Sequence, residues 1–182
     1  MISVYLIGLF TVGAILWLAI YIRNEKHGIA DFGKVTLHLC GALNGTHSGQ
    51  ARFDVLEVSN TKVWVISMRN DWSKTFSFQL SLSSLGGDYL TQPVPGSYAI
   101  ASGSYGSTSA FSASYSHIVN SNQLHVDAYN TLNKGGGVLI IEAADDSEVS
   151  GSFIFIAHRH DSSLANLSVI EVSGKFTAPK AV

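Results

Sequence analysis

Alternation of apolar and polar residues along most of the chain is the feature that most restricts its possible folds. The clearest case is the stretch 74–82, where phenylalanine or leucine alternates with serine or glutamine. A period of two places successive side chains on opposite faces of an extended strand. No helical period longer than two turns occurs after residue 33. The pattern therefore predicts an all-β domain.

Ten segments show this alternation, and turn-forming residues such as Asn44-Gly45, Pro95-Gly96 and Gly135-Gly136 separate them. The expected strands cover residues 34–40, 51–58, 62–68, 74–82, 97–101, 110–118, 123–129, 137–142, 152–157 and 168–172. Many short strands with turns at regular intervals are typical of an antiparallel sandwich or barrel. We expect an antiparallel β-sandwich over residues 34–182.

The stretch 96–122 is rich in Ser, Gly, Ala and Tyr, a composition that flexible linkers share. Larger residues nevertheless recur in it at every second position: Tyr98, Ile100, Phe111, Ala113, Tyr115 and His117. This recurrence specifies one face of a strand. We therefore expect two strands here, joined by a loop over 103–109.

The first 22 residues contain no charged side chain. About 20 apolar residues suffice to cross a membrane as a helix. We therefore expect a transmembrane helix over residues 1–23 and a hinge over 24–33. Tyr5 and Tyr21 would lie at the two membrane interfaces, and Arg23 would end the span. The segment lacks the basic n-region and the small-residue cleavage site of a signal peptide, so we expect it to be retained.

Gly8, Thr11 and Ala14 fall along one side of this expected helix, as small residues do where another helix packs closely. The segment has no ionisable side chain that could relay protons or ligate a haem. We expect it to serve as an anchor and a packing element.

The expected location is the bacterial inner (cytoplasmic) membrane, crossed once. Arg23 and Lys26 follow the span, which favours a cytoplasmic domain, and the free thiol of Cys40 agrees with a reducing compartment. The Ser-, Gly- and Asn-rich composition favours a periplasmic domain instead. The sequence leaves the side of the membrane open.

Composition excludes some partners and sites. Charged residues make up 13% of the chain, and its 11 Lys and Arg residues form no basic run, so we expect no nucleic-acid partner. The single cysteine, Cys40, allows neither an internal disulfide nor a metal site built from cysteines.

The densest polar constellation is the run 158–161, where His158 and His160 point the same way on an extended segment and Asp161 follows. These three residues are weak candidates for a metal site, because imidazole and carboxylate suit several divalent metals. A further ligand would have to come from one of four other histidines: His38, His47, His117 and His125. The alternative is that polar residues gather in a loop. We expect no bound metal and no cofactor.

Two other groups allow a functional and a structural interpretation. The acidic residues Glu142, Asp145, Asp146 and Glu148 form either a calcium site or, as we expect, a solvated hairpin tip. The aromatic residues form either a surface platform for a ligand or part of the core: Trp64, Trp72, Tyr89, Tyr98, Tyr105 and Tyr115.

The C-terminal segment 149–157 reads VSGSFIFIA and is followed by a short valine-containing stretch, 169–172, and by Gly174-Lys175-Phe176. This SGxFxFxA and GxF pattern resembles the closing hairpin of a family of small, uncharacterised bacterial β-sandwich domains. The resemblance covers roughly thirty residues and implies a sandwich. Members of the family are usually exported and often lipid-anchored, and they provide no catalytic residues to transfer to this chain.

A single span followed by an extrinsic β domain is similar in architecture to small accessory subunits of bacterial photosynthetic and respiratory complexes. We therefore expect a non-catalytic structural subunit that anchors to the lipid bilayer and stabilises a larger membrane complex. Its partners would be the other subunits of that complex. The alternative is a membrane-tethered module that binds carbohydrate, lipid or peptide. An enzyme that uses a metal at His158 and His160 comes third.

Overall fold

The structure is a computed structural model that describes residues 32–58, 61–72, 76–84, 93–101, 110–120, 125–159 and 168–181. In this part of the chain the secondary structure is all β, in nine strands. The strands are β1 (Gly33–Gly41), β2 (Gly45–Val58), β3 (Thr61–Arg69), β4 (Phe78–Ser84), β5 (Gly96–Ile100), β6 (Ala110–Asn120), β7 (His125–Ala144), β8 (Glu148–Arg159) and β9 (Val169–Pro179).

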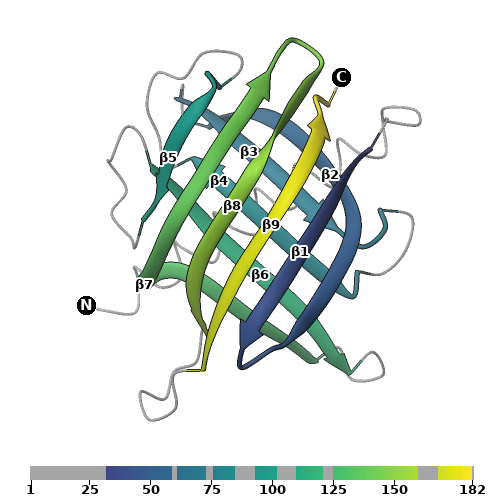
Figure 1. Cartoon of the computed structure of the whole chain (residues 1–182), viewed down its shortest axis with the longest axis vertical. Coiled ribbons are helices and arrows are strands. Elements are labelled where there is room, and N and C mark those ends of the chain that lie inside the picture. The colour runs from purple at the N-terminus through teal and green to yellow at the C-terminus, as the bar shows by residue number, and fades with distance from the viewer. Residues whose placement is uncertain are drawn as a thin grey trace. The chain divides into compact units, whose positions relative to one another are not determined.

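The nine strands close into a barrel in the order β1-β2-β3-β4-β6-β5-β7-β8-β9 (Figure 1). The first and last strands close it, since β1 pairs antiparallel with β9 from Lys34 opposite Thr177 to Gly41 opposite Ile170. The predicted β-sandwich is therefore wrong. A sandwich would leave the edges of two sheets unpaired, whereas here the pairing of β1 with β9 joins both edges of one sheet.

Alternation along the strands divides the interior of the barrel from its outer surface. On β1, Val35, Leu37 and Leu39 are buried, while the residues between them face solvent. The same division repeats around the barrel and fills the interior with large apolar side chains, among them Phe53, Phe78, Phe111, Phe155, Leu80, Leu82 and Leu139. These side chains belong to one hydrophobic core inside the barrel.

Strand β7 bends where it changes partners. Its first part pairs with β6, from His125 opposite Asn120 to Asn130 opposite Ser114. Its last part pairs with β5, which also pairs in parallel with the start of β6. We call this divergence of β6 and β7 around β5 the fork. At the fork, the backbone N–H of Ala113 donates a hydrogen bond of 3.1 Å to Oγ1 of the buried Thr131.

Glycine makes the bend at the fork possible. Gly135 has a φ of +104°, a conformation that side chains with a Cβ rarely adopt. A Cβ on Gly135 would lie 2.1 Å from the carbonyl oxygen of Ile156 on β8. The register between β7 and β8 shifts between Asn130 and Gly135, so the bend is a bulge within one long strand.

A second, smaller cluster is buried outside the barrel wall. Arg52 and Asp54 alternate with the inward residues of β2 and therefore face outward, yet both are buried. Trp72 lies over Arg52, with the guanidinium carbon 5.7 Å from the ring centroid. Phe32 stacks on Trp72 at 5.4 Å with the rings 7° from parallel. Gln50 Oε1 accepts a 3.0 Å hydrogen bond from the Trp72 backbone N–H.

The expected N-terminal helix, 1–23, lies outside the described residues, as do its packing residues Gly8, Thr11 and Ala14. The same holds for Tyr5, Tyr21 and Arg23 and for most of the expected hinge. Within the described residues, none of the secondary structure is a helix with the length and apolar character needed to cross a membrane.

Candidate functional site

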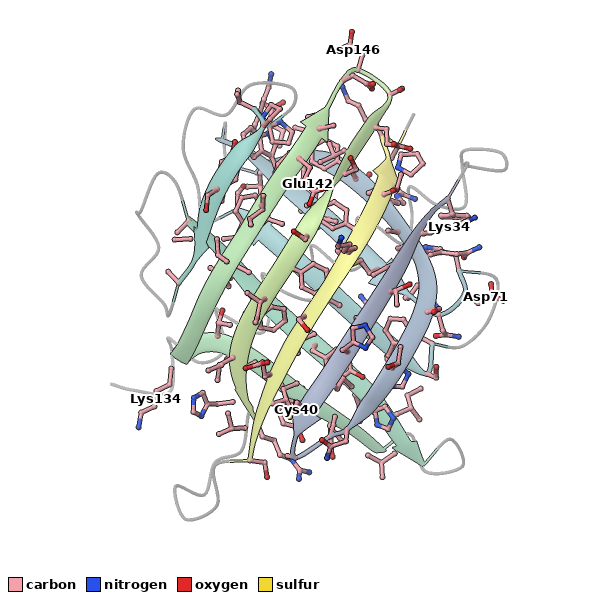
Figure 2. All side chains as sticks on the ribbon, viewed as in Figure 1. Lys34, Cys40, Asp71, Lys134, Glu142 and Asp146 are labelled. Carbon is pink, nitrogen blue, oxygen red and sulfur yellow. The ribbon has the colours of Figure 1, made fainter. Side chains whose placement is uncertain are left out.

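The two ends of the barrel interior differ in chemistry. One end, where β3 begins and β4 ends, is aromatic. Trp64 meets Tyr98 edge-on at 6.1 Å, and Tyr98 meets Phe111 edge-on at 5.6 Å. The Tyr98 hydroxyl donates a 2.6 Å hydrogen bond to the carbonyl of Val94. The hairpin tip that carries Asp146 belongs to this end, at the top of Figure 2.

The opposite end, near Cys40 at the bottom of Figure 2, is polar. We call the following inward-facing residues the polar end: His47, Tyr115, His117, Asp127, Tyr129 and Arg159. They come from β2, β6, β7 and β8, which begin or end at this side of the barrel.

Strand register places the two histidines of the polar end next to one phenylalanine. His47 is opposite Leu37, and His117 is opposite Phe78, so both histidines share the inward face of the core residues. The ring of His47 is 5.3 Å from that of Phe78 and 6.5 Å from that of His117. Burial, and then the nearby His117, lower the pKa of His47, which favours its neutral imidazole form.

The two tyrosines form a cross-strand pair, with Tyr115 on β6 opposite Tyr129 on β7 and ring centroids 6.5 Å apart. Tyr115 is fully buried, and burial followed by the neighbouring Tyr129 raises its pKa. The phenol is therefore a hydrogen-bond donor and not a nucleophile at neutral pH. Its hydroxyl has no hydrogen-bond partner within the described structure, and neither has Nδ1 of His117.

The charges at the polar end are paired. Arg159 on β8 forms an ion pair with Asp127 on β7, the residue opposite His117. Burial, and then the Asp127 carboxylate, raise the pKa of Tyr129, and Arg159 partly offsets this. The polar end therefore offers several uncharged hydrogen-bonding groups beside a compensated pair of charges.

The predicted metal ligands do not join this cluster. His158 precedes Arg159 on β8 and lies on the outer face, opposite Asn130 and Val169. His160 and Asp161 lie outside the described residues. The residues that are described contain no group of three or more His, Cys, Asp or Glu placed to hold a metal ion.

Two other sequence interpretations can be compared with the structure. Asp145 lies in the turn between β7 and β8, and its Oδ1 accepts hydrogen bonds from the backbone N–H groups of Ser147 and Glu148 at 2.7 Å and 2.9 Å. The predicted hairpin tip is confirmed. A surface platform loses two of its six members, because Trp64 and Tyr115 are buried in the core. Tyr89 and Tyr105 lie outside the described residues.

An apolar surface lies on the outer face of β7, β8 and β9. These three strands are at the front of Figure 1. We define the aliphatic strip as four residues with exposed fractions of 36–44%: Ile140, Ile154, Ile156 and Val169. Ile154 and Ile156 are successive outward residues of β8. Ile140 is opposite Ser152 and Val169 is opposite His158, so each lies diagonally next to one of these isoleucines.

Sequence reasoning missed both the polar end and the aliphatic strip, although part of the signal for the polar end was present. The alternation predicts Tyr115 and His117 on one face of the strand 110–118, which is the face that points inward. The partners from β2 and β7 could not be assigned, because period two does not specify which strands pair.

Comparison of the chain with protein-family models, curated proteins and solved structures found no match.

Proposed function

We propose that this protein is a non-catalytic accessory subunit whose barrel docks on a larger membrane complex through the aliphatic strip. The observation that carries the proposal is the exposure of four neighbouring aliphatic side chains on one outer face. A contiguous apolar patch on the outer surface of a protein marks an interaction site, because burying it against a partner is favourable.

The outer surface next to the aliphatic strip is polar. Next to Ile154 and Ile156, the outer face of β9 carries Glu171, Ser173 and Lys175. Other exposed valines are apart from the strip: Val94 before β5, Val119 near the end of β6 and Val126 near the start of β7. An apolar centre with a polar rim is the usual anatomy of a protein interface.

The partner in this proposal is another subunit of a membrane complex. The uncharged residues 1–22 would hold the barrel at the bilayer, so a resident membrane protein is the partner that the strip would meet most often. A photosynthetic or respiratory assembly is the class that this architecture suggests. Anchoring raises the local concentration of both components, which allows a small strip to suffice.

The test is a double variant, Ile154→Thr with Ile156→Thr, expressed as the full chain in its native membrane. Threonine keeps the β-branched shape that strands favour and removes apolar surface. The variant should keep its β-type circular dichroism spectrum but lose co-migration with the complex on a native gel in mild detergent. A Ser114→Thr variant on β6, away from the strip, is the control and should co-migrate like the wild type.

Two results would contradict the proposal. The first is undiminished co-migration of the double threonine variant. The second is a wild-type protein that runs as a monomer in the mildest detergent that extracts it.

A further inference from the structure

We propose that the polar end is a binding site for a small, uncharged ring-containing molecule that presents a hydrogen-bond-accepting oxygen to Tyr115 and His117. This site is separate from the aliphatic strip, which lies on the outer surface of the barrel. It therefore goes beyond the docking role.

The first argument is the pair of unsatisfied polar atoms. The Tyr115 hydroxyl and His117 Nδ1 are buried, and both lack a hydrogen-bond partner within the described structure. A buried polar group left without a partner costs free energy, and such groups are uncommon in folded proteins. An additional molecule that hydrogen-bonds to both would remove this cost.

The second argument is reach. Tyr115 and His117 are successive inward residues of β6, so their Cα atoms are about 7 Å apart. Both face the barrel interior, where Phe78 on β4 is the cross-strand neighbour of His117 and Tyr129 on β7 is that of Tyr115. A molecule no larger than one ring with a short substituent can contact both residues.

The chemistry of the site defines the class of ligand. The Tyr115 phenol keeps its proton because burial disfavours the phenolate, so its natural partner is an acceptor oxygen. The rings of Phe78, His47 and Tyr129 supply aromatic walls suited to a flat apolar body. Arg159 is already neutralised by Asp127, which gives an anionic ligand no uncompensated positive charge.

One ordered water molecule is the competing occupant, since a water can bridge two buried polar groups. The experiment must therefore separate a ligand from a water. We choose acetophenone as the probe, ethylbenzene as its counterpart without the carbonyl oxygen, and benzoate as its charged counterpart. The full chain, labelled with ¹³C at tyrosine Cζ, is titrated with each compound by NMR.

The proposal expects acetophenone to shift the Tyr115 resonance in a saturable way, whereas benzoate binds more weakly. A Tyr115→Phe variant, followed through the amide signals of β6, should bind acetophenone about threefold to tenfold more weakly. Its affinity for ethylbenzene should be unchanged. Tyr98→Phe is the matched control, because it removes a tyrosine hydroxyl at the aromatic end, where Val94 already accepts its hydrogen bond.

A second pair of variants tests the histidine and covers the case in which Tyr115→Phe does not fold. His117→Leu should weaken acetophenone binding, while His158→Leu, on the outer face of β8, should not. No saturable shift with millimolar acetophenone would mean that a water alone occupies the site, and would overturn the proposal. Equal losses of acetophenone and ethylbenzene affinity in Tyr115→Phe would also overturn it.

Discussion

Arg52 and Asp54 are two residues apart on β2 and form an ion pair through two hydrogen bonds, both of 2.8 Å. Only 4% of Arg52 and 1% of Asp54 is exposed, although both lie on the outer side of the barrel wall. Burial of two charges is tolerated because each satisfies the other, and because the ring of Trp72 lies over the guanidinium.

The first prediction follows from this pair. Asp54→Ala removes the carboxylate and leaves the guanidinium in a buried position without it. Loss of one partner of a buried pair typically lowers the free energy of unfolding by about 3–5 kcal/mol. Urea unfolding followed by circular dichroism measures the loss. The double variant Arg52→Met with Asp54→Leu removes both charges and should lose less than the single variant; an equal or larger loss would contradict this account.

The second prediction concerns the bend in β7. Gly135→Ala introduces a Cβ at a positive φ and 2.1 Å from the Ile156 carbonyl oxygen, so we expect a loss of about 2–5 kcal/mol in the free energy of unfolding. Gly96→Ala on β5 is the control, because the nearest atom to its added Cβ is 3.9 Å away. This variant should change the free energy of unfolding by less than about 1 kcal/mol. Similar losses in both variants would show that the bend does not depend on Gly135.

The third prediction is a pH dependence from His47. Its pKa in the folded protein lies below the ordinary value of 6.5, so the unfolded chain binds the proton more readily. The stabilising contribution is present above pH 6.5 and is lost as the pH falls through the folded-state pKa. Urea midpoints measured between pH 7.5 and pH 5 should decrease, and His47→Gln should reduce the decrease.

A variant of His117 tests why the pKa of His47 is lowered. Repulsion from His117 is the second contribution, after burial. The variant His117→Leu should therefore raise the pKa of His47 toward 6.5, as measured by NMR titration of the histidine rings. An unchanged or lower pKa in this variant would assign the whole effect to burial.

The fourth prediction is that a chain of residues 32–182 folds without the first 31 residues. Phe32–Ala181 form one compact unit, and both strands that close the barrel, β1 and β9, lie within it. The shortened chain should give a β-type circular dichroism spectrum and one cooperative thermal transition. An aggregate without such a transition would show that the barrel needs the N-terminal segment.

Alternation in the sequence predicts strands well here because every strand has one buried face. It cannot separate a sandwich from a barrel, since both fold types bury alternate residues in the same way. The deciding contact pairs residues 34–41 with residues 170–177, at opposite ends of the described chain. The C-terminal pattern SGxFxFxA, on which the expectation of a sandwich also rests, is the same local alternation and therefore could not resolve this choice.

Local signals also misplace some strand limits. The expected strands 123–129 and 137–142 are one strand, β7, because Gly135-Gly136 forms a bulge and not a turn. Strand β2 begins at Gly45, although residues 45–50 contain no alternating apolar residues. Of the polar end, Tyr115 and His117 could be placed on one face from the sequence. Their proximity to His47 depends on long-range pairing.

The fork sets an order for folding. Strands β6 and β7 can pair early, because only residues 121–124 separate them along the chain. The five residues of β5 must then insert between β6 and β7. These two strands are by then already paired with each other over residues 114–120 and 125–130. Pairing of β1 with β9 requires nearly the whole chain to be in place. Refolding should therefore be slow for a domain of this size, and β5 should acquire protection from hydrogen exchange after the paired residues of β6 and β7 do.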